Sequence, residues 1–196
     1  MRFFLTFTLI LAFEIIFSQD SCFLHRTPSM DDYVNDTAHL LVKRLTEYVN
    51  SFNGCTAPPF VATALNGNKI SSEELKGEVV VLNFWFTHCK PCVGEFASLN
   101  KLVDEYSGKE VVFISFALDS DNVLDSFLVK HPLKYEIVPS AKGFSELFKV
   151  WPYPTNMVLD KNFKVVQGFR GGTVNPDEAM KNYGLIKPFI DLALKK

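Results

Sequence analysis

Apolar residues follow a helical spacing in the first quarter of the chain and a mixed spacing after it. Between residues 31 and 52, apolar side chains from Val34 to Phe52 recur at intervals of three and four positions, the pattern of an amphipathic helix. Asn53 and Gly54 follow, and these residue types commonly end a helix. We therefore expect a helical segment here that packs on the rest of the protein as a structural brace.

From Cys55 onward, short apolar runs alternate with amphipathic stretches. Many runs are rich in β-branched and aromatic residues, and their lengths fit strands. The predicted strands cover residues 60–64, 69–70, 78–85, 111–117, 135–138, 155–159 and 163–169. The predicted helices cover residues 90–106, 121–130 and 143–150, and a last one opens near 175 and is broken at Gly184 and Pro188. This order predicts an α/β fold with a mixed central sheet flanked by helices.

Two turns are expected between the early strands. Asn66 and Gly67 tolerate the positive φ that a tight hairpin needs, so the strands at 60–64 and 69–70 should form an N-terminal β-hairpin. Residues 71–75 then have the pattern of a capped helical turn.

The first residues have the layout of a secretory signal peptide. Arg2 precedes an apolar run at residues 3–17, and small or polar residues follow from Ser18. We expect cleavage after Ser18 and hence an exported protein. An uncleaved membrane anchor is the alternative, although the run is shorter than a bilayer-spanning helix and Glu14 interrupts it.

The composition fits one globular domain with extensions. The chain has 196 residues, of which 47% are hydrophobic, enough to bury a sizeable core. Its 20 Lys and Arg oppose 22 Asp and Glu, for a formal net charge of -2. No strong electrostatic field therefore favours nucleic acid, and we expect no nucleic-acid partner.

The candidate chemistry lies where a buried strand at 78–85 is followed by a helix. Cys89 and Cys92 are three positions apart, and on a helical turn this puts them about 5–6 Å apart, within the range that a disulfide accepts. Cys89 falls at the helix N-terminus, where free N–H groups, together with the neighbouring Lys90, stabilise a thiolate. We expect Cys89 to attack and Cys92 to resolve the mixed disulfide, and Pro91 to be tolerated in the first turn.

Two other uses of this cysteine pair remain open. An inert structural disulfide is one, since spacing alone does not show cycling. A zinc or copper site is the other, with His88 or a remaining cysteine as a further ligand, but such sites normally need two more ligands than the pair supplies.

At these residues the chain resembles a known family. The block at 80–85 leading into Cys89 and Cys92, the sequence Tyr-Pro-Thr at 153–155 and the motifs at 57–60 and 65–67 occur in matching order. They resemble the thioredoxin superfamily, and within it the bacterial TlpA/ResA-like exported thiol–disulfide oxidoreductases with an AhpC/TSA or Redoxin-type domain. The resemblance covers roughly residues 55–172 and implies a thioredoxin-like fold. The expected division is a signal peptide at 1–18, a helical N-terminal extension at 19–54 and a thioredoxin-like domain at 55–196.

The resemblance implies a substrate-docking site beside the cysteine pair. The family carries a cis proline that faces the pair, and Pro154 takes that position. The backbone before it is then free to pair with an extended substrate, and Tyr153 would touch the partner. The alternative is that residues 151–154 form only a rigid loop before a strand.

The resemblance also implies a proton-relay carboxyl. Glu95 matches a family glutamate near the buried thiol, where a partly desolvated carboxylate has a raised pKa and can relay a proton for Cys92. Asn83 stands where ordinary thioredoxins have a buried aspartate, so Glu95 is its nearest substitute. The alternative is that Glu95 is a first-turn acid that only stabilises the helix dipole.

Two positions depart from the family pattern. His88 replaces the tryptophan usual before the first cysteine, and Ala97 replaces a proline that commonly kinks the helix. His88 is therefore a candidate substrate-binding residue that tunes the Cys89 thiolate, with a plain surface histidine as the alternative.

The remaining cysteines, Cys22 and Cys55, flank the predicted N-terminal helix. In an oxidising compartment they are able to form a structural bridge, although sequence does not fix connectivity. A lipid-bearing N-terminus at Cys22 is the competing hypothesis, but Gln19 and Asp20 suit a lipoprotein signal poorly.

Together these features predict dithiol–disulfide exchange on exported proteins through Cys89 and Cys92, without a dissociable cofactor and without a bound metal. The resemblance favours a reductant in the periplasm, tethered to the membrane only if the signal is retained, supplied by an upstream membrane electron donor. We expect a monomer. The rivals are a thiol peroxidase, whose usual Pro-x-x-x-Thr-x-x-Cys loop is absent here, a copper or zinc carrier, and a redox-inactive binding module.

Overall fold

A computed structural model describes residues 21–24 and 27–196. The expected signal peptide at 1–18 therefore lies outside the described residues. None of the helices in the described ranges is long and apolar enough to cross a bilayer.

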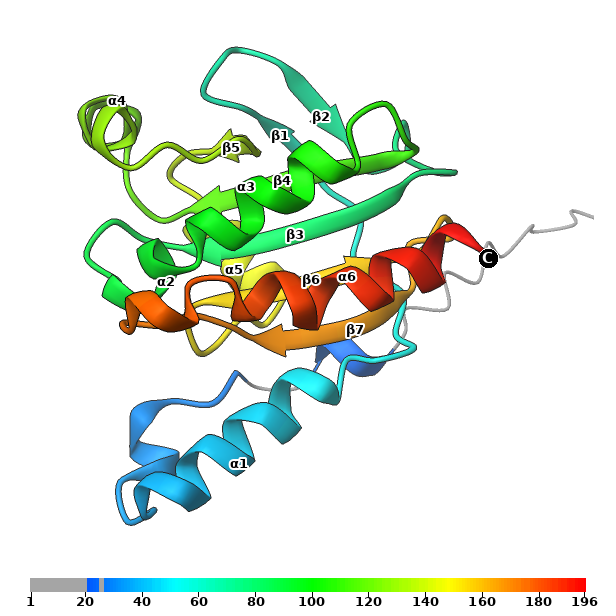
Figure 1. Ribbon diagram of the computed structural model, residues 1–196. Coiled ribbons are helices and arrows are strands. Elements are labelled where there is room, and N and C mark those ends of the chain that lie inside the picture. Colours follow the sequence, from blue (N-terminus) through cyan, green and yellow to red (C-terminus); the bar gives the residue numbers. More distant parts are fainter. Residues whose placement is uncertain (1–20, 25–26) are drawn as a thin grey trace, which may run out of the picture.

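The centre of the molecule is a five-stranded mixed sheet (Figure 1). In spatial order its strands are β5 (Glu136–Val138), β4 (Val111–Ala117), β3 (Val79–Trp85), β6 (Thr155–Leu159) and β7 (Val165–Arg170). β3, β4 and β5 run parallel, whereas β6 and β7 are antiparallel to their neighbours. Every residue of β3 is buried, as its continuous apolar run predicts for a central strand covered on both faces. The predicted α/β fold with a mixed sheet is confirmed.

Helices cover both faces of this sheet (Figure 1). The helices are α3 (Phe96–Glu105), α4 (Asp121–Lys130), α5 (Lys142–Leu147) and α6 (Lys181–Leu194). Successive side chains of a strand point to opposite faces, so Val81 packs with Leu102 of α3 and Ile186 of α6, whereas Leu82 packs in the other core with Phe148. The sheet is thus a layer between two apolar cores.

The expected hairpin precedes the sheet. β1 (Val61–Thr63) and β2 (Lys69–Ser71) pair antiparallel, and Gly67 adopts a φ of 88°, in the region that glycine reaches without strain. The segment after β2 forms turns and no regular helix, although Leu75 N donates to Ser71 O as one helical turn requires.

The N-terminal helix begins later than its apolar pattern suggests. After two short 3₁₀ helices, η1 (Ser21–Leu24) and η2 (Met30–Tyr33), the helix α1 spans Ala38–Asn50. Thr37 has extended backbone, and its hydroxyl accepts a hydrogen bond from Leu40 N, so it caps the helix and fixes its start. The predicted start at residue 31 is therefore wrong, and Val34 is exposed.

α1 lies against β7, the edge strand of the sheet (Figure 1). A Cβ at Gly168 would lie 2.7 Å from the Val49 carbonyl oxygen, so the missing side chain lets the helix approach the strand closely. Val165 N donates to Cys55 O, and Gly54 N donates to Val165 O. The chain just after α1 therefore covers part of an edge that would otherwise be open to pairing with another strand.

A disulfide joins Cys22 to Cys55, with their Cα atoms 6.0 Å apart. The bridge that the sequence left open is therefore present in the structure. Phe23 next to it stacks on Phe52 with ring centroids 4.8 Å apart, so η1 is tied to the end of α1 by a bond and by a ring contact.

The helix expected at 90–106 is divided into α2 (Lys90–Gly94) and α3, with Glu95 between them. Glu95 N bonds to Cys92 O rather than to Pro91 O, the acceptor that a continuous helix would use. The Pro91 carbonyl instead accepts from Thr173 N, which comes from a loop far along the chain. This tertiary bond accounts for the interruption, even though Ala97 stands where the family has its kinking proline.

The break predicted in the last helix is absent. Asn175 caps the short 3₁₀ helix η3 (Pro176–Glu178), and α6 then continues through both Gly184 and Pro188. Ile190 and Ala193, beyond the proline, are fully buried. Burial of this face against the core offsets the backbone hydrogen bond that proline cannot make.

Candidate active site

The cysteine pair lies at the C-terminal end of β3, where the chain turns into α2. Cys89 is the N-cap of α2 and Cys92 lies within it, and the two form a disulfide with Cα atoms 5.2 Å apart. Cys89 is 6% exposed, whereas Cys92 is fully buried. The two sulfurs are therefore unequal, since only Cys89 has any access to solvent.

The segment between β3 and Cys89 is held by a carboxylate that the sequence did not single out. Asp119, which follows β4, accepts hydrogen bonds from Thr87 N at 2.7 Å and from Thr87 Oγ1 at 2.8 Å. His88 is exposed, and its Nδ1 lies 3.1 Å from the same hydroxyl. His88 therefore lies at the surface beside Cys89 without entering the core.

Pro154 packs against the redox helix. A Cβ at Gly172 would lie 2.8 Å from Pro154 Cγ and 2.9 Å from Pro91 Cβ, so these two prolines meet at a position that only glycine fits. The peptide bond between Tyr153 and Pro154 is cis, as expected, and the bond before Pro152 is cis as well, which the sequence did not suggest.

Tyr153 lies beside the chain that leads to Cys89. Its ring packs edge-on against Phe86 with centroids 5.6 Å apart, and its side chain is half-buried. Tyr153 and His88 thus both lie next to the segment that leads to Cys89, and their roles in substrate binding stay predictions.

Glu95 is fully buried in a cage of nitrogen donors. Its carboxylate oxygens accept hydrogen bonds from Asn83 Nδ2 at 2.9 Å, Asn156 Nδ2 at 3.2 Å and Gly172 N at 2.9 Å. Asn182 Nδ2, from α6, donates as well. No cation takes part in these bonds, so neutral dipoles alone stabilise the charged form.

Burial dominates the electrostatics of this carboxyl. Loss of solvent raises the pKa of Glu95 from 4.5 to about 7, although the hydrogen bonds from Asn156, Gly172 and the other amides act to lower it. A group with this pKa takes up and releases a proton near neutral pH, which is what a relay for a buried thiol needs.

A chain of hydrogen bonds fixes which way the Asn83 amide points. Trp85 Nε1, which only donates, bonds to Ser115 Oγ at 2.6 Å, and Ser115 Oγ donates to Asn83 Oδ1 at 3.2 Å. The Asn83 amide oxygen is therefore occupied, and its Nδ2 faces Glu95. Ser115 on β4 therefore acts on Glu95 indirectly, through Asn83.

Asn156, Gly172 and Asn182 of this cage were missed from sequence, and Asn83 was named only as the residue that stands in place of an aspartate. Asn83 and Asn156 face each other in the register of β3 and β6, and an asparagine in each of two buried apolar strands is the signal that was available. A Cβ at Gly171 would lie 2.2 Å from Glu95 Oε2, so this glycine leaves room for the carboxylate. Asn182 lies on a helix 87 positions away and had no local signal.

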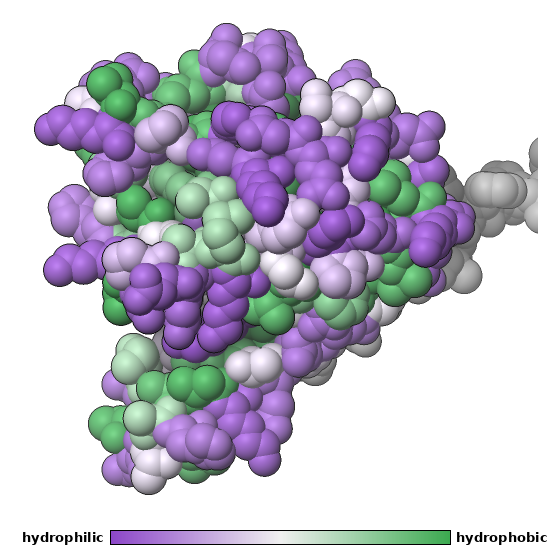
Figure 2. All heavy atoms as spheres, in the orientation of Figure 1, coloured by the Kyte–Doolittle hydropathy of each residue, from purple (hydrophilic) through white to green (hydrophobic). Residues whose placement is uncertain are grey.

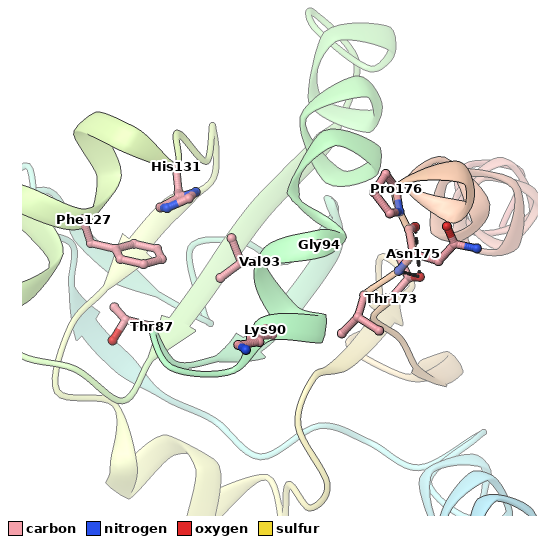
Figure 3. A pocket seen from close by; sticks show the side chains of 10 residues that line it. Thr87, Lys90, Val93, Gly94, Phe127, His131, Thr173, Asn175 and Pro176 are labelled. Carbon is pink, nitrogen blue, oxygen red and sulfur yellow. Dashed lines mark hydrogen bonds between the residues drawn. The ribbon is translucent and has the colours of Figure 1, made fainter.

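An open cavity of about 510 Å³ crosses the exposed face of α2 (Figure 3). Lys90 and Val93 of α2 line its floor, with Phe127 and His131 on one side and Thr173 on the other. In the part of the chain that the structure describes, no group of three or more His, Cys, Asp or Glu side chains is placed to hold a metal ion.

The arrangement agrees with comparisons to known proteins. Residues 53–167 match the model of the AhpC/TSA family. The chain belongs to this family. It is 38% identical over 120 residues to the thiol-disulfide oxidoreductase ResA of Bacillus thuringiensis subsp. konkukian, an alignment that covers 60% of this chain and 69% of ResA. It is 37% identical over 128 residues to the thioredoxin-like protein YneN of Bacillus subtilis, covering 64% of this chain and 75% of YneN.

Solved structures show the same fold. A crystal structure of a Chlorobium tepidum protein described as thiol:disulfide interchange protein DsbE superposes with a TM-score of 0.64 at 24% identity, covering 72% of this chain and 97% of that one. DsbF of Mycobacterium tuberculosis superposes with a TM-score of 0.54 at 27% identity, covering 67% and 99%. The fold is thioredoxin-like, and this AhpC/TSA family member is a thiol–disulfide oxidoreductase with a Cys-x-x-Cys pair.

Proposed function

We propose that this AhpC/TSA family protein reduces disulfides in exported proteins, with Cys89 as the attacking sulfur and Cys92 as the resolving one. The observation that carries the proposal is the difference in exposure between the two sulfurs, because a partner meets Cys89 first while Cys92 is enclosed behind it. Lys90 and the open N-terminus of α2 favour a thiolate at Cys89.

The reaction transfers two electrons from the reduced pair to the partner. The Cys89 thiolate attacks one sulfur of the partner disulfide, the partner S–S bond breaks, and the other partner sulfur leaves as a thiolate that takes a proton. Cys92 then loses its proton and attacks the Cys89 sulfur of the mixed disulfide. This step forms the bond between Cys89 and Cys92 and releases the second partner sulfur.

Glu95 is the group we assign to the proton of Cys92. A carboxylate at pH 7 accepts the thiol proton as the Cys92 sulfur attacks, and the proton later leaves to solvent. The support is its burial, its placement three residues after Cys92 and its pKa of about 7. A first-turn acid that served only the helix dipole would need neither the burial nor the cage of amide donors.

Tyr153, Pro154 and His88 are proposed to contact the partner. The support is that Tyr153 packs on Phe86 three residues before Cys89, that Pro154 lies near Pro91 of α2, and that His88 directly precedes Cys89. An extended partner segment can pair with the backbone ahead of Pro154 while its cysteine reaches Cys89.

The cellular setting is proposed from the sequence. We propose that residues 1–18 are a signal peptide, that 19–54 form an extension on a thioredoxin-like domain at 55–196, and that the protein works as a monomer in the periplasm. The oxidised pair must be reduced again by an upstream dithiol donor, and we propose that this donor is membrane-bound. Support comes from the disulfide between Cys22 and Cys55, since such bonds persist in oxidising compartments.

Trapping tests the assignment of the two sulfurs. The probe is a synthetic peptide with an internal Cys-x-x-Cys disulfide, mixed with reduced protein and analysed by mass spectrometry under non-reducing conditions. Cys92→Ser should accumulate a mixed disulfide on Cys89, whereas Cys89→Ser should form none. Equal trapping in both variants rejects the scheme. The direction is tested by the reduction potential, for which a value near about -270 mV supports a reductant and one near about -120 mV an oxidant.

A further inference from the structure

The N-terminal extension contacts the segment that leads to Pro154. The ring of Tyr33 stacks on the ring of Trp151, with centroids 5.2 Å apart and an interplanar angle of 10°. The hydroxyl of Tyr48 donates a 2.6 Å hydrogen bond to the carbonyl oxygen of Lys149. Both η2 and α1 therefore hold the chain just before Pro154.

The residues of the extension that make this contact are themselves held in place by their neighbours. Tyr33 is buried, and the guanidinium of Arg44 lies over its ring, 4.4 Å from the ring centroid. Arg44 is held in turn by Asp36, whose carboxylate oxygens lie 2.8 and 3.0 Å from one guanidinium nitrogen and whose side chain is nearly buried. Little conformational freedom remains to be lost when a partner binds here.

Two positions after Trp151 in the chain comes Tyr153, whose ring lies beside the segment that leads to Cys89. Trp151 and Tyr153 are both half-buried and are separated by one proline. Tyr153 packs on Phe86, which lies three residues before Cys89. We call Trp151, Tyr153 and Phe86 the aromatic row, which Tyr33 of the extension supports through its stack on Trp151.

We infer that the extension determines which protein substrates reach the pair, because it supports the aromatic row on which an extended partner segment docks. The partner segment carries an apolar or aromatic side chain next to its cysteine. This inference rests on the proposed function, since a partner whose sulfur reaches Cys89 must lay its neighbouring residues on the adjacent surface. Tyr33, Arg44 and Tyr48 precede residues 53–167, so the match to the AhpC/TSA family does not account for them.

The chemistry of the row favours this class of partner. Rigid aromatic rings give a large contact area at a low entropic cost and bind apolar side chains well. The extension also has exposed apolar residues, among them Leu40 and Val42 of α1. Figure 2 shows apolar residues over this part of the molecule. They make no part of the row.

The test compares two substrates in the full-length protein. One is a disulfide peptide of sequence Cys-x-x-Cys with phenylalanine before the first cysteine, and the other is 5,5′-dithiobis(2-nitrobenzoate), which is too small to span the row. Tyr33→Ala should lower the ratio of the two second-order rate constants about three- to tenfold, as expected for the loss of an aromatic contact. Tyr33→Phe keeps the stack and should retain the ratio.

A second variant and a control keep the result decisive. Trp151→Leu removes the other ring of the stack and should lower the ratio similarly, even if Tyr33→Ala does not fold. Tyr183→Ala, on α6 and away from the row, should leave the ratio as it is. An unchanged ratio in both Tyr33→Ala and Trp151→Leu overturns the inference while leaving the proposed function intact. A wild-type protein whose Cys89 attacks neither substrate overturns the proposed function instead.

Discussion

Glu95 shows how the pKa of a single side chain is set by burial and by the groups that surround it. Its charge is enclosed without a counter-ion and stabilised by three amide side chains and one backbone N–H. Each of these donors can only offer a proton to the carboxylate, so the cage favours the charged form while burial favours the neutral one. The balance puts the pKa of Glu95 at about 7.

The raised pKa of Glu95 predicts how the free energy of unfolding changes with pH. Because the folded pKa is raised from 4.5 to about 7, the folded state holds the proton more tightly than the unfolded one. The contribution is present in full below about pH 4.5 and is lost as the pH rises through 7. At about 1.4 kcal/mol per pKa unit, the free energy of unfolding should fall by about 3 kcal/mol more between pH 4 and pH 8 in the wild type than in Glu95→Gln.

Urea unfolding of the oxidised protein across this pH range measures the difference between the two proteins. Subtracting the Glu95→Gln curve removes the contributions of all other titrating groups. Parallel curves would show that Glu95 titrates as an ordinary surface carboxyl and would contradict its placement in the cage.

Ser115 makes a prediction about the reaction. Ser115→Ala frees the oxygen of Asn83, so its amide is no longer held with Nδ2 toward Glu95. With one donor fewer, the pH midpoint for attack by Cys92 should rise by about one pH unit. Ser98, equally buried but bonded to a backbone oxygen, supplies the matched control.

The rate of mixed-disulfide resolution as a function of pH measures that midpoint. Ser98→Ala should keep the wild-type midpoint, and combining Ser115→Ala with Glu95→Gln should cancel the effect of Ser115→Ala. A Ser115→Ala shift that persists without the Glu95 carboxyl would mean that Ser115 acts by another route.

At the scale of elements, sequence patterns predicted the strands better than the junctions. β4 and α4 have the predicted bounds, because an apolar run or stripe between polar turns is local information. The division of the helix into α2 and α3 at Glu95 was not predictable, because it depends on a hydrogen bond from Thr173 N to the Pro91 carbonyl oxygen. α6 was predicted to break because local rules count the cost of Pro188 and not the burial around it.

The same distinction holds for the site. Cys89, Cys92 and Pro154 were singled out as candidates because they lie in motifs that resemble the family, and Glu95 because it follows the cysteine motif closely; their roles stay predictions. Asn182 and Gly171 were not singled out, because they reach Glu95 only through tertiary packing.

The disulfide between Cys22 and Cys55 should stabilise the folded protein. It closes a loop with a sequence separation of 33 residues, for which the chain-entropy model gives about 3–4 kcal/mol. Replacing both cysteines by serine should lower the free energy of unfolding by up to this amount in urea titration. Reactivity of Cys89 toward a small disulfide should remain, because the redox pair lies on other elements. Full stability without the bond would show that η1 is held by packing alone.

At the scale of the whole molecule, the fold brings four distant segments to one end of the sheet. The ends of β3 and β4 deliver Cys89 and Asp119, and the chain on either side of the antiparallel strands β6 and β7 delivers Pro154 and Gly172. This is possible because the sheet contains both parallel and antiparallel strands. The loop that carries the cysteines, the loop before β6 and the loop after β7 therefore lie at the same end of the sheet. The extension adds a fifth segment through its contact with Trp151.

Alkylation of the reduced protein compares the reactivity of Cys89 and Cys92 and so tests the proposed roles of the two sulfurs. Iodoacetamide is added at several pH values between 5 and 9, and the label on each cysteine is mapped by mass spectrometry. We expect Cys89 to be labelled first, with a pH midpoint below that of a free cysteine at about pH 8.5, and the buried Cys92 to be labelled more slowly. Labelling of Cys89 no faster than a free cysteine, or labelling of Cys92 first, would contradict these roles.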